Sequence, residues 1–241
     1  HIMKVVKPYN NANNKKEQVT KMFNNIANSY DFLNHSLSLG MDNVWRKLAI
    51  KKIDNNPKRI LDIATGTGDF AITAAKYTNA HITGIDISDG MLNIGRKKIF
   101  KKKLDKRITL NNADCESLPF SDNSFDVVTA GFGVRNFENL NKGLSEIFRV
   151  LKKNGIVIIL EPSSPKLFPL KQIYNLYFHY ILPIIGSLIS RDKSAYKYLP
   201  ESVNQFPSGS KFIIEMENVS FKDCEFYPLS LGVVSLYTAI K

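Results

Sequence analysis

Short apolar runs alternate with amphipathic segments along most of the chain after residue 58. The runs are continuous rather than alternating with polar residues, which predicts strands buried on both faces of a parallel sheet. The expected strands are RILDIA, HITGIDI, RITLNNAD, FDVVTAGF and GIVIILE, at residues 59–64, 81–87, 107–114, 125–132 and 155–161. The expected helices between them are residues 68–78, 88–104 and 141–151. We expect Ser88 to cap the second of these helices and Gly155 to end the third.

The alternation breaks after residue 161. Residues 167–190 form a long aromatic segment that Pro169 and Pro183 interrupt. Its length would allow a membrane span, but its polar residues and prolines favour a helical insertion beside an apolar cavity. A helix at 208–219 and two strands at 220–229 and 231–240 then end the chain, and the strands are expected to pair at the sheet edge. Two further helices, at 15–34 and 42–52, are expected to pack on this core.

These elements predict one α/β domain over residues 1–241. Its sheet is mostly parallel with an antiparallel C-terminal edge hairpin, and helices cover both faces. A hydrophobic fraction of 44% and a charged fraction of 23% fit a globular protein with a sizeable core.

The formal net charge of +11 is unusual and allows three interpretations: nucleic acid, an anionic membrane surface, or a solvated basic face. Much of the excess lies in GRKKIFKKKLDKR, residues 95–107, at the expected end of a helix, which favours the solvated face. Cys115 and Cys224 lack metal-ligand spacing, so we expect no metal site and no disulfide framework. The opening HIM has no signal-peptide pattern, and we expect a cytoplasmic protein.

The glycine loop after the first strand, in ILDIATGTGDFA, can be interpreted in two ways. Gly66 and Gly68 match the GxGxxA pattern of dinucleotide sites, although a tight strand-to-helix turn alone would explain them equally well. Asp62 precedes the loop and Asp69 lies in it; two carboxylates repel a pyrophosphate but suit a ligand with an ammonium and a sulfonium. S-adenosylmethionine carries both groups, so charge favours this cofactor.

Acidic residues also follow the next two strands. Asp86 ends the second strand, where its carboxylate can accept hydrogen bonds from both ribose hydroxyls. Asp114 ends the third, where it can accept the adenine amino group while the backbone of Cys115 meets the ring. A solvated loop carboxylate explains each acid singly but explains the ordered series poorly. The series predicts a ligand crevice at the carboxyl edge of the sheet.

The segments DIATGTGD, GIDISDGML, NADCESLPFSDNSFDVVTAGFGVRNF and EIFRVLKKNG resemble the class I methyltransferases, which have a Rossmann-like sheet. More narrowly, they resemble the quinone C-methyltransferases of menaquinone and ubiquinone biosynthesis. YDFLNHSLSLGMDNVWRK, FHYILPIIGSLI and SAYKYLPESVNQFP extend the likeness over nearly the whole chain. Ala64 departs from the wider superfamily, which often has glycine there, but the narrower family tolerates alanine.

The resemblance implies a substrate, a cofactor and a division of the chain. The substrate would be a prenylated quinol, and S-adenosylmethionine would leave as S-adenosylhomocysteine. Within the domain, residues 1–58 would form a helical cap, 59–161 the cofactor-binding core, 162–208 a helical substrate insertion, and 209–241 the last helix and edge strands. The cofactor-binding residues carried over from the motifs are Asp62, Gly66, Thr67, Gly68, Asp86, Ile87, Met91, Asp114, Cys115 and Gly131.

Arg135 and Asn136 lie among apolar neighbours in TAGFGVRNF, and a buried guanidinium needs an anion. Ring methylation needs an ionised quinol, whose phenol has a pKa of about 10 unless a cation in a dry site lowers it. We therefore expect Arg135 to stabilise the quinolate and Asn136 to position a ring oxygen. The alternative is that Arg135 pairs with a protein carboxylate such as Glu161.

Tyr30, in SYDFLN, is expected from the family resemblance to close the site together with Asp31, although core packing would explain Tyr30 nearly as well. No general base stands out. His35 and His179 are each better explained as packing or surface residues, and water can accept the proton.

Three other functions compete with this interpretation. A nucleic-acid N-methyltransferase usually has an Asn/Asp-Pro-Pro-aromatic turn after the fourth strand, and this chain has GFGVRNF there, so no nucleic-acid partner is expected. The loop carboxylates oppose a nicotinamide oxidoreductase. A non-catalytic cofactor-binding subunit stays open, as does a homodimer. The basic face also suits anionic lipid, so we expect peripheral contact with the inner face of a membrane.

Overall fold

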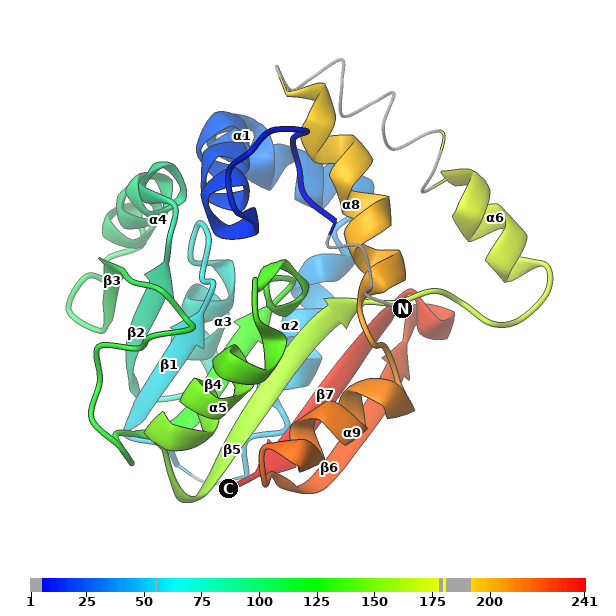
Figure 1. The fold of residues 1–241 in the computed structure, drawn as a ribbon. Helices are drawn as coiled ribbons and strands as arrows, with labels where there is room; N and C mark the ends of the chain where they lie inside the picture. The colour runs from blue at the N-terminus through cyan, green and yellow to red at the C-terminus, as the bar shows by residue number, and fades with distance from the viewer. Residues whose placement is uncertain (1–5, 55, 178–179, 181–191) are drawn as a thin grey trace.

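The computed structural model describes residues 6–54, 56–177, 180 and 192–241, and a seven-stranded sheet lies at their centre (Figure 1). Its strand order is β3-β2-β1-β4-β5-β7-β6. The first five strands are parallel, and β7 runs antiparallel to both β5 and β6. The predicted sheet and its edge hairpin are confirmed. The strands are β1 (Arg59–Ile63), β2 (His81–Asp86), β3 (Ile108–Asn112), β4 (Phe125–Gly131), β5 (Leu151–Pro162), β6 (Lys222–Leu229) and β7 (Val234–Ile240).

Helices cover both faces of the sheet. The described α-helices are α1 (Lys15–Leu37), α2 (Met41–Ile50), α3 (Asp69–Tyr77), α4 (Asp89–Lys101), α5 (Leu140–Val150), α6 (Leu170–Leu176), α8 (Lys193–Gln205) and α9 (Ser210–Asn218). Two 3₁₀ turns, η1 (Val134–Asn136) and η3 (Ser230–Gly232), follow β4 and β6. In Figure 1, α5 and α9 lie on the front face, while α2 and α3 lie behind.

Two apolar clusters explain why the central strands are mostly apolar. Leu61 and Ile63 of β1 pack with Phe212 and Met216 of α9 and with the apolar side of α5, whereas Ile60 packs on the opposite face with α2, α3 and α4. Successive strand residues point to opposite faces, so a strand covered on both sides buries apolar residues at successive positions.

The ends of two helices test the predicted caps. The Ser88 hydroxyl accepts a hydrogen bond from the Met91 N–H, which confirms Ser88 as the N-cap of α4. The prediction that Gly155 ends α5 was wrong. The helix stops at Val150, and Leu151, which is fully buried, is already extended and pairs with Phe125 in the sheet. Burial of Leu151 against the strand outweighs the glycine signal four residues later.

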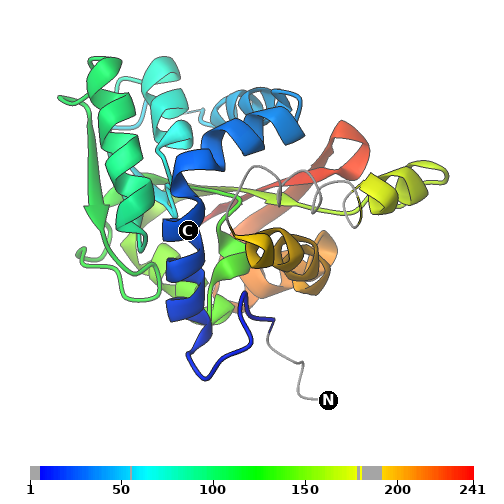
Figure 2. The ribbon, with the colours of Figure 1, turned by 90° about the horizontal axis from the view of Figure 1, so that it is seen from above.

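The first helix, α1, lies over the carboxyl ends of the parallel strands with α8 beside it (Figures 1 and 2). Val19, Met22 and Ile26 of α1 pack with Ala195 and Tyr198 of α8 in a third apolar cluster. The predicted insertion at 167–190 lies partly outside the described residues, which include α6. No helix within the described ranges is long and apolar enough to cross a membrane.

Candidate active site

A small cavity lies at the carboxyl ends of β1, β2 and β4, and we call it the sheet-edge cavity. It measures about 60 Å³, with α1 lying across it. Among the residues predicted to bind cofactor, it is lined by Gly66, Asp86, Ile87, Met91, Asp114, Cys115 and Gly131. The residues of α1 that cover it are Lys16, Val19, Phe23 and Tyr30. The crevice at this edge of the sheet therefore lies where the acid series predicts it.

Asp86 holds the glycine loop against the start of α4. One carboxylate oxygen accepts a hydrogen bond from the Gly66 N–H at 2.8 Å, and the other accepts one from the Ser88 N–H at 2.9 Å. Burial raises the pKa of Asp86, and these backbone donors oppose that effect. Gly66 has a φ of +56°, a left-handed conformation that favours glycine, while the nearest atom to an added Cβ would be 3.5 Å away. Backbone conformation, more than space, therefore requires this glycine.

Asp114 has a partner that the sequence did not reveal. Its carboxylate lies 2.7 Å from the Nζ of Lys16 and accepts a hydrogen bond from the Glu116 N–H at 2.9 Å. Lys16 also lies 3.6 Å from the Glu116 carboxylate. Next to this pair, burial raises the pKa of the Cys115 thiol, which therefore stays protonated. The first turn of α1 is thus fixed over the end of the cavity where adenine is expected.

Asp62, Thr67 and Gly68 do not line the sheet-edge cavity. Asp62 is fully buried and accepts hydrogen bonds from the hydroxyls of Thr65 at 2.5 Å and Thr129 at 2.7 Å, and burial raises its pKa to about 6. Gly68, with φ +82°, precedes α3 as its N-cap residue. These three residues support the glycine loop without lining the cavity.

Thr67 belongs to a polar cluster on the outer side of the loop. Its hydroxyl donates to Asp31 of α1 at 2.5 Å. The Nζ of Lys98 lies 2.7 Å from Asp31 and 2.5 Å from Asp69, so one lysine joins α1, the glycine loop and α4. Asp31 therefore ties α1 down from outside the cavity, instead of closing the site as the sequence suggests.

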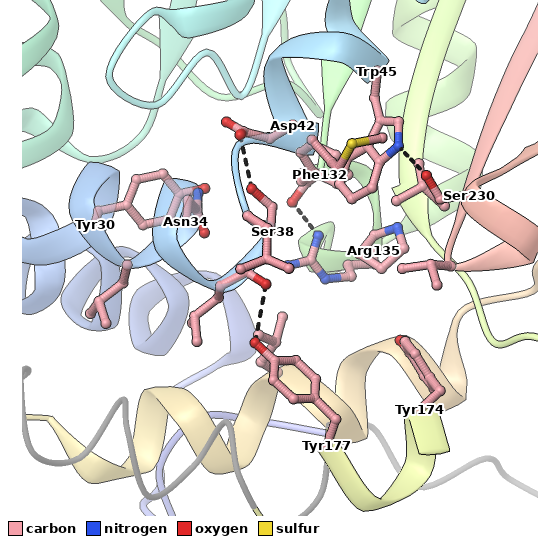
Figure 3. Close-up of a pocket in the computed structure, with 18 of the residues that line it drawn as sticks. Tyr30, Asn34, Ser38, Asp42, Trp45, Phe132, Arg135, Tyr174, Tyr177 and Ser230 are labelled. Atoms are coloured by element: carbon pink, nitrogen blue, oxygen red, sulfur yellow. Dashed lines mark hydrogen bonds between the residues drawn. The ribbon is translucent and has the colours of Figure 1, made fainter. Parts of the chain in front are cut away.

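A second and larger cavity, which we call the apolar cavity, lies between α1, α2, α6, α8 and η3 (Figure 3). It measures about 560 Å³, within the usual range for small-molecule sites. Trp45 of α2 forms part of its wall and donates from Nε1 to the Ser230 hydroxyl at 2.8 Å. Tyr174 and Tyr177 lie on the opposite side, next to Arg135 and Ser38 respectively. The apolar residues of its wall include Met22, Ile26, Leu33, Leu170, Ile173 and Leu199.

The two cavities meet. Four residues line both of them: Phe23, Tyr30, Phe132 and Asn136. Phe23 and Tyr30 contact each other edge to face, with ring centroids 6.0 Å apart, and burial raises the pKa of Tyr30. Two ligands, one in each cavity, would therefore face each other across this junction.

Arg135 lies in η1, next to the junction, and pairs with a protein carboxylate. Its Nη1 lies 3.1 Å from Glu161 and also donates to the Phe132 carbonyl, while its Nε donates to the Ser202 hydroxyl at 3.3 Å. The Arg135 side chain is 8% exposed and that of Glu161 is fully buried. Burial raises the pKa of Glu161, and the guanidinium opposes this effect. The alternative that the sequence left open, a Glu161 partner, is therefore the arrangement in this structure.

Several site residues could not be identified from the sequence. Lys16 and Lys98 belong to no motif, and Tyr198 and Ser202 lie in the family-like segment SAYKYLPESVNQFP, which gave neither of them a role. Each of the four contacts a predicted residue that is distant along the chain. His35 lies 2.6 Å from Asp42 at the α1–α2 junction and does not line either cavity. The other histidine considered, at position 179, lies outside the described residues.

The strand order, the crevice at the strand ends and the acid series define an S-adenosylmethionine-dependent methyltransferase of class I. Solved structures agree on the fold. A SAM-dependent methyltransferase from Thermotoga maritima has a TM-score of 0.64 at 19% identity, covering 92% of this chain and 99% of that one. One from Methanococcus maripaludis has a TM-score of 0.62 at 20% identity, covering 97% and 96%.

Comparison of the sequence with known families identifies the family. A model of the ubiE/COQ5 methyltransferase family matches residues 11–241, and the chain belongs to that family. A demethylmenaquinone methyltransferase of Bacteroides fragilis is 48% identical over 98% of this chain and 97% of its own length. A ubiquinone/menaquinone biosynthesis C-methyltransferase of Geotalea daltonii is 46% identical over 94% of this chain and 97% of its own length.

The hydrogen-bonding groups around the sheet-edge cavity fit S-adenosylmethionine in their chemistry. Asp86 and Asp114 offer carboxylate oxygens at successive strand ends, and Gly66 brings the backbone close. The space is smaller than the roughly 300–1,000 Å³ of a ligand site. Side chains of α1 form one of its walls.

Proposed function

We propose that the chain transfers a methyl group from S-adenosylmethionine to a ring carbon of a prenylated quinol in menaquinone or ubiquinone biosynthesis. The observation that carries this proposal is the apolar cavity of about 560 Å³, which meets the sheet-edge cavity at a shared junction. An apolar tail in the larger cavity would place a ring at that junction. Membership of the ubiE/COQ5 family and the names of its relatives support the same reaction.

The residues at the junction suit an ionised ring. The cofactor supplies an electrophilic methyl group, and the ring carbon attacks it more readily when a neighbouring hydroxyl has lost its proton. Arg135 keeps a positive charge beside the cavity, and its Glu161 partner lies behind it, fully buried. Asn136 lines both cavities and can offer its amide to a ring oxygen. The hydroxyl proton passes to water; after the carbon–carbon bond forms, the ring proton also passes to water and the ring oxygen takes a proton back, so one proton is released for each methyl group transferred.

The mouth of the apolar cavity supports contact with a membrane surface. Leu39, Ile173 and Leu231 line the cavity and are still 89%, 60% and 69% exposed. Phe168, near α6, is 81% exposed, and Lys166 and Lys171 nearby are exposed cations. A prenylated substrate resides in lipid, so an apolar rim with cations matches an anionic bilayer at the inner face of the membrane. The basic run on α4 lies at the other side of the molecule (Figure 2).

Two experiments test this function. Labelled S-adenosylmethionine is offered with each reduced precursor, demethylmenaquinol and the demethylated ubiquinol, and label should appear on the ring carbon of at least one. Binding of S-adenosylhomocysteine without transfer to either quinol would identify a non-catalytic subunit. For the membrane contact, binding to anionic vesicles should weaken as salt rises and in a Phe168→Ser variant. Vesicle binding that changes neither with salt nor in the Phe168→Ser variant would contradict the proposed membrane contact.

A further inference from the structure

One turn of α8 contacts both residues proposed to act on the quinol. Tyr198 and Ser202 are four residues apart and therefore lie on the same face of the helix. The Tyr198 hydroxyl donates to the Oδ1 of Asn136 at 3.1 Å, and the Ser202 hydroxyl accepts from the Nε of Arg135 at 3.3 Å. α8 and η1 are far apart in sequence, and this contact fixes the orientation of two adjacent side chains.

The Tyr198–Asn136 hydrogen bond is sheltered from water. Tyr198 is 3% exposed and Asn136 is 9% exposed. Burial raises the pKa of Tyr198 to about 12, so the hydroxyl keeps its proton near neutral pH. An asparagine amide has one acceptor oxygen and one donor nitrogen. With Oδ1 used by Tyr198, Nδ2 is the end that is available toward the junction of the cavities.

We propose that Tyr198 is a positioning residue that orients the Asn136 amide so that its N–H groups face the quinol oxygen. This inference rests on the proposed function. A donor at that position stabilises the quinolate more than the neutral quinol, because a hydrogen bond to an anion is stronger than one to a hydroxyl. The opposite amide orientation would present a carbonyl, which would favour the protonated quinol.

A Tyr198→Phe variant tests the role of this hydroxyl, because it removes one oxygen and keeps the ring packing. Near neutral pH, kcat should fall about 3- to 10-fold, the usual loss for one neutral hydrogen bond, with KM for the quinol and affinity for S-adenosylhomocysteine unchanged. The pH at which kcat reaches half of its alkaline plateau should rise by about half to one pH unit, so the deficit should close at high pH. A residue that only packs would not move this profile.

The other charged and titratable groups around the junction stay the same in this variant; they include Lys15, Tyr30, Arg46, Asp86, Arg135, Glu161 and Tyr174. Tyr237→Phe is the matched control. Tyr237 is buried in the core and lines neither cavity, and its hydroxyl accepts a hydrogen bond from the Gly209 N–H at 2.8 Å, away from Asn136. This control should keep the wild-type kcat and pH profile.

A double variant completes the test. If Tyr198 acts through Asn136, Tyr198→Phe should add nothing to the loss in kcat caused by Asn136→Ala. Wild-type kcat and profile in Tyr198→Phe, or losses that multiply in the double variant, would overturn the inference. A profile shifted toward lower pH would show the opposite amide orientation and overturn it equally. If the wild-type chain itself methylates neither quinol, the proposed function fails first and the inference falls with it.

Discussion

Replacing Arg135 by alanine separates two roles of the same guanidinium. The side chain pairs with Glu161 at 3.1 Å and also lines the apolar cavity beside the proposed ring site. If Arg135 stabilises the quinolate, its removal should lower kcat roughly 10²–10³-fold, as for the loss of one preorganised electrostatic donor. If the pair with Glu161 is its main role, the loss should appear in stability instead.

The cost in stability follows from the burial of Glu161. Removing one partner of a buried ion pair costs about 3–5 kcal/mol, a large part of the 5–15 kcal/mol of a typical domain. Burial already raises the pKa of Glu161, and loss of the guanidinium would raise it further. Because the folded pKa then lies well above the unfolded value of about 4.3, the free energy of unfolding should fall as pH rises between these two values. Arg135→Ala should therefore be least destabilising in acid.

A second substitution keeps the protein folded while its activity is measured. In Arg135→Ala/Glu161→Gln the stranded carboxylate is gone, so urea unfolding should show much of the lost stability restored. The kcat of this double variant should stay low, and Arg135→Lys should recover only part of the rate, because lysine lacks the planar fork of donors. Affinity for S-adenosylhomocysteine, measured by calorimetry on the same samples, should barely change.

Two results would refute this reasoning about Arg135. An Arg135→Ala variant as stable as the wild type would show that the pair contributes little to the fold. A double variant that regains both stability and kcat would make Arg135 a purely structural cation and remove it from the chemistry.

Three further predictions concern the cofactor, the tail and a buried acid. Asp86→Ala should weaken S-adenosylhomocysteine binding by about 1–3 kcal/mol in calorimetry, through lost charged hydrogen bonds, while NAD binds neither protein. Quinols with successively shorter tails should lose kcat/KM in steps, up to about 0.8 kcal/mol per buried CH₂, until the apolar cavity is empty. Burial raises the pKa of Asp62 to about 6, so the free energy of unfolding should fall as pH rises from about 4 to 6. The free energy of unfolding of Asp62→Asn, measured with urea, should depend less on pH in that window.

Each of these predictions has an outcome that contradicts it. Tight NAD binding without an S-adenosylhomocysteine signal would exclude the cofactor. An equal kcat/KM for every tail length would show that the apolar cavity does not bind the tail. Identical pH profiles for the wild type and Asp62→Asn would show that Asp62 titrates as it does in the unfolded chain.

The positions of the buried strands along the chain could be predicted because burial on both faces leaves a strong pattern. The run IVIIL, residues 156–160, has no polar position, and β5 is buried between helices for this reason. Competition between a local helix-end signal and pairing in the sheet was harder to predict. Gly155 and the two lysines before it suggest a helix end, but Leu151 pairs with Phe125 and ends the helix earlier.

The site was predictable where it depends on strand ends and unpredictable where it depends on distant partners. Asp86 and Asp114 follow strands, so topology alone brings them to one edge. The charge argument built on Asp62 and Asp69 is weaker in the structure, because Asp62 is buried among hydroxyls and Asp69 is paired with Lys98. Such pairs join residues that only the folded chain brings together.

Helix α1 is shared by the walls of both cavities, through Phe23 and Tyr30. Because Lys16 and Asp31 fasten α1 to the rest of the fold, a ligand that displaces α1 at one cavity would also move a wall of the other. Thermodynamic reciprocity then applies: whatever factor the cofactor imposes on quinol affinity, the quinol imposes on cofactor affinity. The affinities for the two ligands are therefore coupled through α1. A substitution at Lys16 should change both of them, although it contacts only one cavity.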